Sequence, residues 1–123
     1  MVNDQITELR QAIKENQEIA DDLKDLATLV EDPLFKKYII DRFCTKCLVD
    51  NAKLANNLKV SVDVRNKAKD FIMSAGLFMN WIDSQLFLLE RAKGDIKECE
   101  QSIETIIHND YEEKLNKEEC DNE

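Results

Sequence analysis

Residues 68–106 read AKDFIMSAGLFMNWIDSQLFLLERAKGDIKECEQSIETI, and this stretch decides the fold class. Apolar or small side chains recur along it at alternating steps of four and three residues, which is the repeat that keeps one stripe of a helix against a partner helix. The positions of this seam are Ala68, Phe71, Ala75, Phe78, Ile82, Gln85, Leu89, Ala92, Ile96, Cys99, Ile103 and Ile106. The seam predicts one helix over residues 62–117, about 80 Å long, followed by a frayed acidic tail over residues 118–123.

A second heptad seam predicts a helix over residues 4–31, capped by Asn3 or Asp4. Its positions are Ile6, Leu9, Ile13, Ala20, Leu23, Ala27 and Val30, and Asn16 fills the missing step. Asp32 and Pro33 then form the clearest break, because Asp caps helices and Pro suits a first helical turn. A middle helix is predicted over residues 33–57, with Ser61 or Asp63 capping the next one. It is expected to run through Leu34, Phe35, Tyr38, Ile39, Phe43, Cys47, Leu48, Ala52 and Ala55.

The composition agrees with a protein made only of helices. Of 123 residues, 43% are apolar and 35% charged, and there are only two Gly and one Pro. All-β and doubly wound α/β domains need more turn residues than this, and a disordered chain has fewer apolar ones. We therefore expect a single all-α domain over residues 1–123. Two arrangements of the helices would bury both seams. One is a long antiparallel helical hairpin with one arm broken at Pro33, and the other is a compact three-helix bundle in which residues 4–31 fold back.

The charge is distributed unevenly along the chain, whose net charge is −9. Residues 1–32 hold nine acids and three bases, residues 33–94 hold six acids and eleven bases, and residues 95–123 hold eleven acids and three bases. Acidic ends oppose nucleic acid and anionic membranes. The most lipid-like stretch, from Phe71 to Leu89, contains Asn80, Asp83 and Gln85, which a membrane-spanning helix tolerates poorly. No membrane partner is therefore expected.

The residues that could bind a metal or take part in catalysis do not form a known motif. Cys44 and Cys47 form a CxxC, but a structural zinc site needs two further ligands, and Cys99, His108 and Cys120 offer no second close pair. Phosphate-binding loops and hydrolase or metalloprotease motifs are absent from the sequence. The sequence thus predicts a protein that is not an enzyme, with no catalytic residues, no metal and no cofactor. Cysteines in helical sequence and the lack of a signal peptide at the start predict a reducing, cytoplasmic setting.

Two groups of side chains are candidates for binding. The first is a set of basic residues around the predicted turn that could contact an anionic surface weakly, namely Lys53, Lys59, Arg65, Lys67 and Lys69. The second is an excess of apolar residues beyond one helical stripe, which predicts a protein interface with a second copy or a larger assembly. Its members are Phe71, Ile72, Phe78, Met79, Trp81, Ile82, Leu86 and Leu88, and Trp81 is expected nearest the contact.

Residues 31–40 (EDPLFKKYII) and 65–76 (RNKAKDFIMSAG) resemble a group of small helical proteins encoded by tailed bacteriophages. The resemblance extends over roughly residues 30–92 and includes Ala52, Leu54, Ala55, Trp81 and Ile82. It implies a structural or assembly component of a phage virion, located in the host cytoplasm or in the particle, and it transfers no functional residue. Two alternatives stay open: an acidic inhibitor of a host enzyme, and a weak nucleic-acid-binding module that uses the basic turn.

Overall fold

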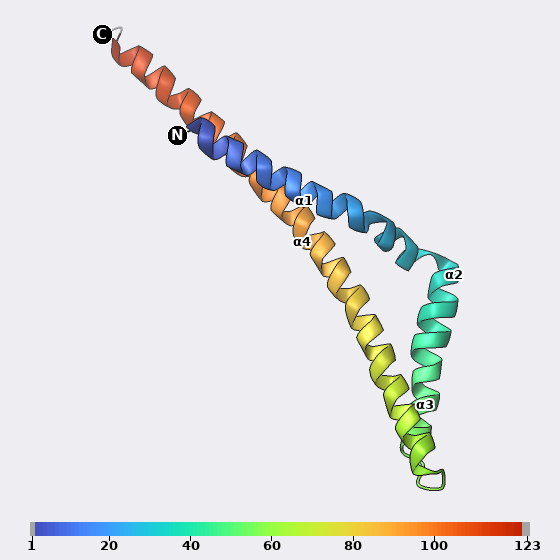
Figure 1. The fold of residues 1–123 in the computed structure, drawn as a ribbon. Helices are drawn as coiled ribbons and strands as arrows, with labels where there is room; N and C mark the ends of the chain where they lie inside the picture. Colours follow the sequence, from blue (N-terminus) through green and yellow to red (C-terminus); the bar gives the residue numbers. More distant parts are fainter. Residues whose placement is uncertain (1, 122–123) are drawn as a thin grey trace. The chain divides into compact units, whose positions relative to one another are not determined.

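The protein is all-α in a computed structural model that describes residues 2–121, of which 94% are helical. Its helical segments are α1 (Val2–Glu31), α2 (Pro33–Phe35), η1 (Lys36–Lys46), α3 (Cys47–Ala55) and α4 (Val62–Asp121), coloured along the chain in Figure 1. Within the described part there is no strand. The prediction of an all-α fold with a very long C-terminal helix is therefore confirmed.

The predicted breaks lie where short polar side chains cap the next segment. The Asp32 carboxylate accepts hydrogen bonds from the backbone N–H groups of Leu34 (2.9 Å) and Phe35 (3.2 Å), with Pro33 in the first turn of α2. Ser61 Oγ accepts one from the N–H of Val64 (3.3 Å) at the start of α4. These bonds satisfy donors that a helix leaves unpaired at its N-terminus. Both caps confirm the sequence prediction, with Ser61 rather than Asp63 as the second cap.

The middle helix differs from the prediction in its turn width. Residues 36–46 form the π-helix η1, in which backbone hydrogen bonds run to the carbonyl five residues back and each turn is wider. Cys44 is buried in this segment, whereas Tyr38 and Phe43 are about half exposed. Both aromatic residues lie within a helical segment, as the sequence predicted.

Arg42 and Lys37 lie over the exposed ring of Tyr38, at 4.9 Å and 5.1 Å from its centroid. Cations over an aromatic face are favourable at exposed sites. The ring of Tyr38 is thus partly covered by side chains of its own segment.

The chain divides into two compact units that share α1 and α4. The first comprises residues 1–22 and 88–123, and the second comprises residues 23–87. In the first unit Gln5, Glu8 and Leu9 line one shallow hollow with Ile106, so the start of α1 lies beside the later part of α4 (Figure 1). Ala20, Leu89 and Ala92 are buried there. This pairing is the one that the hairpin layout predicted for the chain ends.

Asn16, the polar residue of the first seam, forms its side-chain hydrogen bond within α1. Its Nδ2 donates to the Ala12 carbonyl at 2.9 Å. The amide N–H is therefore engaged by its own helix.

The second unit is a helical hairpin with a core of small and aliphatic side chains. Residues 33–55 run back against the first part of α4 through a link over residues 56–61 (Figure 1). The rings of Phe43 and Phe71 meet edge to face, with centroids 5.5 Å apart. The buried residues of this unit are Leu23, Cys44, Ala68, Ala75 and Ile82. Alanine at two of these positions lets the helices approach closely.

Helix α4 continues to Asp121, four residues beyond the predicted end at 117. Two contacts between side chains one turn apart support this last part, each at 3.2 Å: the ion pair of Lys114 Nζ with Asp110 Oδ2, and the contact of His108 Nε2 with Glu112 Oε1. Of the tail predicted to fray, residues 118–121 are thus helical, and residues 122–123 lie outside the described residues.

Replacing Gly76 by Ala is expected to stabilise the protein. A Cβ at this position would meet no heavy atom within 4 Å, and the backbone φ is negative. Glycine inside a helix costs conformational entropy, so Gly76→Ala should raise the free energy of unfolding by about 0.5–1 kcal/mol. Urea denaturation followed by circular dichroism measures the change. The matched control is Ala75→Gly at the neighbouring buried position, which should lower the stability; a loss of stability in Gly76→Ala would contradict the expectation.

Candidate functional site

The candidate site is a set of exposed apolar side chains on α4 in the second unit, here called the outer face. It consists of Met73, Leu77, Trp81 and Phe87, which are 68%, 64%, 54% and 71% exposed. Met73, Leu77 and Trp81 follow one another at four-residue steps, so they stack along one side of the helix. Large apolar residues are common on surfaces singly, but a continuous row marks an interaction site.

Met73, Leu77 and Phe87 of the outer face lie on the side of α4 away from the buried seam, and Trp81, next to buried Ile82, lies between that side and the seam. Leu77 follows buried Ala75 by two residues, and a helix turns through about 100° per residue. The side chains that cover the seam therefore leave the outer face uncovered. One helix thus carries two apolar surfaces in this unit, of which the hairpin occupies only one.

The residues predicted for a protein interface divide between these two surfaces. Ile82 is buried in the seam, Phe71 packs on Phe43, Ile72 is half-buried, and Met79 and Leu86 line a hollow inside the unit. Trp81 and Phe78 are exposed in the second unit, and Leu88 is exposed where α4 enters the first. The prediction missed Met73, Leu77 and Phe87. The four-residue steps from residue 73 to residue 81 were the signal that could have found the first two.

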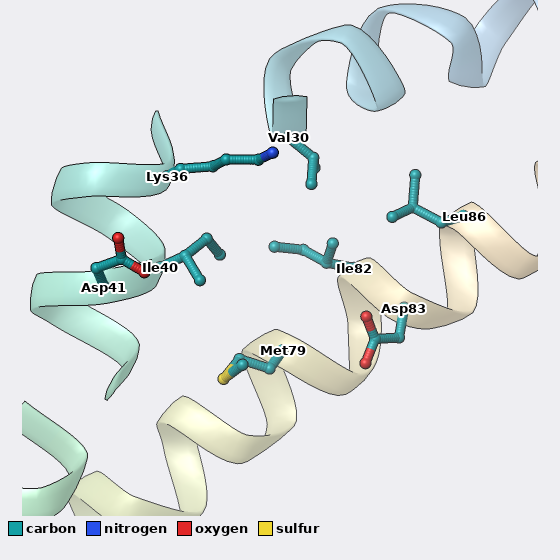
Figure 2. A pocket seen from close by; sticks show the side chains of 8 residues that line it. All are labelled: Val30, Lys36, Ile40, Asp41, Met79, Ile82, Asp83 and Leu86. Atoms are coloured by element: carbon teal, nitrogen blue, oxygen red, sulfur yellow. The ribbon is translucent and has the colours of Figure 1, made fainter. Parts of the chain in front are cut away.

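The hollow of about 290 Å³ lies where the end of α1, η1 and α4 meet in the second unit (Figure 2). Side chains from all three segments point into it, and its lining consists of Val30, Lys36, Ile40, Asp41, Met79, Ile82, Asp83 and Leu86. Lys36 Nζ is paired with the Glu31 carboxylate at 2.8 Å, and Asp41 and Asp83 add two further carboxylates to the lining. The mainly apolar lining can accept an apolar group.

The five predicted anion contacts all lie in the second unit, near the link between α3 and α4. Lys53 ends α3, Lys59 lies in the link, and the other three lie in the first turns of α4. All are exposed except Arg65, which is half-buried and whose Nε has no hydrogen-bond partner. Leu58, which is the most exposed large apolar residue among those that the structure describes, lies in the same link. The link therefore presents positive charge around an aliphatic side chain.

The cysteines are separated by the fold. Cys44 is buried and Cys47 half-buried in the second unit, whereas Cys99 and Cys120 belong to the first. Burial raises the pKa of the Cys44 thiol, so it holds its proton more firmly than an exposed thiol. In the part of the chain that the structure describes, no three His, Cys, Asp or Glu side chains come together as a metal site would need. The predicted absence of a bound metal stays a prediction.

Judged by length and composition alone, α4 is the one helix among the described residues that could cross a membrane. Only 17% of its most apolar window is buried, which is a consequence of the uncovered outer face. The expectation that no membrane is a partner stays a prediction.

Comparison with known proteins finds no match to this chain among protein-family models, curated proteins or solved structures.

The thiols are expected to react in the order of their exposure. Cys120 should be alkylated fastest and Cys44 slowest, and the two rates should differ by about tenfold or more. A buried thiol with a raised pKa forms little of the reactive thiolate, and the reagent reaches it only when the structure opens locally. Mass spectrometry of peptides after timed alkylation measures the four rates. In denaturant the rates should converge. Equal rates for Cys44 and Cys120 in the folded protein would contradict the burial of Cys44.

Any binding of nucleic acid should be weak and should depend on the link. Replacing the exposed Lys59, Lys67 and Lys69 by Glu should abolish it, and the affinity of the unaltered chain should fall steeply with salt. Fluorescence anisotropy with a labelled oligonucleotide measures both effects. The matched control replaces three lysines of the first unit by Glu, and it should change the affinity for the oligonucleotide little. These lysines are Lys97, Lys114 and Lys117. Binding that withstands high salt would contradict this expectation.

Proposed function

We propose that the chain is a non-enzymatic interaction protein that works by assembly with other protein surfaces, and that the outer face of α4 is its contact. The observation that carries the proposal is the row of exposed Met73, Leu77, Trp81 and Phe87. Fully burying one such side chain contributes about 1.5–3 kcal/mol. Trp and other aromatic residues are also enriched where protein interfaces concentrate their binding energy.

The larger structure is proposed to be a phage particle, with the chain as a structural or assembly component. The support is the resemblance of residues 31–40 and 65–76 to small helical proteins of tailed phages. A helical protein with an uncovered apolar face suits a role in which neighbouring proteins cover that face. The proposed location is accordingly the host cytoplasm before assembly, and the virion afterwards.

The second candidate is an acidic inhibitor of a host enzyme, and the charge of the first unit favours it. Residues 1–22 and 88–123 hold eighteen acidic against seven basic residues. Acidic surfaces attract basic clefts over long range. In this function the first unit would be the contact, and the outer face would contribute little.

Sedimentation equilibrium and binding of an apolar dye by the full chain test whether the outer face is a contact surface. The wild-type chain should associate at micromolar concentration or bind an apolar dye, and Trp81→Glu should abolish both by placing a charge in the row. The matched control is Leu34→Glu, which alters a side chain of similar exposure (66%) in α2. A wild-type monomer that binds no dye would overturn the proposal.

Mass spectrometry of purified phage particles, produced from a genome that encodes the chain, separates the two candidates. An assembly component should remain in the particles after density-gradient purification, and Trp81→Glu should remove it. An inhibitor should stay in the soluble lysate with one host protein, and its capture should depend on the acidic residues of the first unit.

A further inference from the structure

The hollow in the second unit, where the end of α1, η1 and α4 meet, has apolar walls. Ile40 of η1 and Ile82 of α4 point toward one another across it (Figure 2). Met79 and Leu86 extend the wall that α4 provides. Ile82 is buried and the other three are half-buried, so apolar surface inside the hollow stays accessible. Its volume of about 290 Å³ is near the lower end of the range of small-molecule sites, which are mostly apolar with a few polar groups.

The charged groups of the hollow are mainly carboxylates. Asp41 comes from η1 and Asp83 from α4, so each of these two walls contributes one (Figure 2). The base in the lining, Lys36, is paired with Glu31 at 2.8 Å. Neither Asp41 nor Asp83 has an ion-pair partner among residues 2–121. The lining together with Glu31 therefore carries one positive and three negative charges.

Neighbouring bases do not cancel this excess of negative charge. Residues 70–90 of α4 contain no Lys or Arg, so Asp83 has no base on its own helix within about two turns. On η1, Lys37 and Arg42 lie over the ring of Tyr38, at 5.1 Å and 4.9 Å from its centroid, and neither lines the hollow. The hollow thus combines an apolar interior with a negatively charged rim.

The wide turns of η1 place apolar and charged residues of the lining on one face. Backbone hydrogen bonds in a π-helix run to the carbonyl five residues back, so residues four and five apart are neighbours on its surface. Lys36, Ile40 and Asp41 have these spacings, and all three line the hollow. π-Helical segments are rare and are often found at functional sites.

We propose that this hollow binds a small organic cation, namely an ammonium ion carried on a short apolar body. The apolar body lies between Ile40 and Ile82, where removing its surface from water is favourable. The ammonium group lies at the rim, in the field of the Asp41 and Asp83 carboxylates. The same two carboxylates repel an anion of similar shape, so the hollow selects its ligand by charge as well as by size. This site uses none of the four residues of the outer face.

NMR of the full chain, labelled with carbon-13 at the methionine methyl groups, tests the site with hexylammonium as the probe. Met79 lines the hollow and Met73 belongs to the outer face, so the two signals distinguish binding at these two places. Hexylammonium, added up to about 10 mM, should shift the Met79 signal saturably and leave the Met73 signal in place. Hexanoate has the same chain length and the opposite charge, and it should bind at least about tenfold more weakly, with hexanol between the two.

Removal of each carboxylate tests the selection by charge. Asp41→Asn and Asp83→Asn keep the shape of the side chain, so each should weaken the binding of hexylammonium about threefold and leave that of hexanol unchanged. The matched control is Asp70→Asn, which removes an exposed carboxylate of α4 outside the hollow and should change neither affinity. Circular dichroism checks that each variant stays helical.

Three results would overturn the proposal. The first is a Met79 signal that does not respond to hexylammonium, including the case in which only Met73 responds. The second is an equal affinity for hexylammonium and hexanoate. The third is wild-type affinity for hexylammonium in both Asp41→Asn and Asp83→Asn.

Discussion

The structure depends on one line of small and aliphatic side chains that α4 must bury. Ala68, Ala75, Ile82 and Leu89 follow one another at seven-residue steps and are all buried. A strict seven-residue repeat keeps this line on one side of a long helix, so any segment that covers it must run along the helix. The alanines leave room for a close neighbour, and Cys44 in the second unit is the small buried residue that comes from the covering segment.

The π-helix η1 is the local adjustment that makes this covering segment fit. Its wider turn carries Cys44 inward and moves Phe43 to the edge, where the ring still reaches Phe71. Segments of this kind are rare and are often found at functional sites. Here the buried residue of the segment is a thiol whose pKa is raised by burial.

A helix with one buried line needs no second apolar surface, and the outer face is therefore the feature that packing within the chain does not explain. Met73, Leu77, Trp81 and Phe87 are more than half exposed, and all four lie off the buried seam. Selection for solubility alone would place polar residues there. The assembly function that we propose would account for them, because covering this face would then contribute free energy to the binding of a partner.

The sequence by itself determined the helices, because capping and heptad spacing act within a few residues of each other. Asp32, Pro33 and Ser61 mark the breaks, and the seam of α4 follows from the order of its residues alone. Only the tertiary structure decided which apolar residues are covered. Ile82 and Trp81 are adjacent and equally apolar by type, yet one is buried and the other exposed, because the covering segment lies along one side of α4. The width of the turns in η1 was likewise decided by packing, since α- and π-helical turns are compatible with the same local sequence and differ in the side chain that they present to a neighbour.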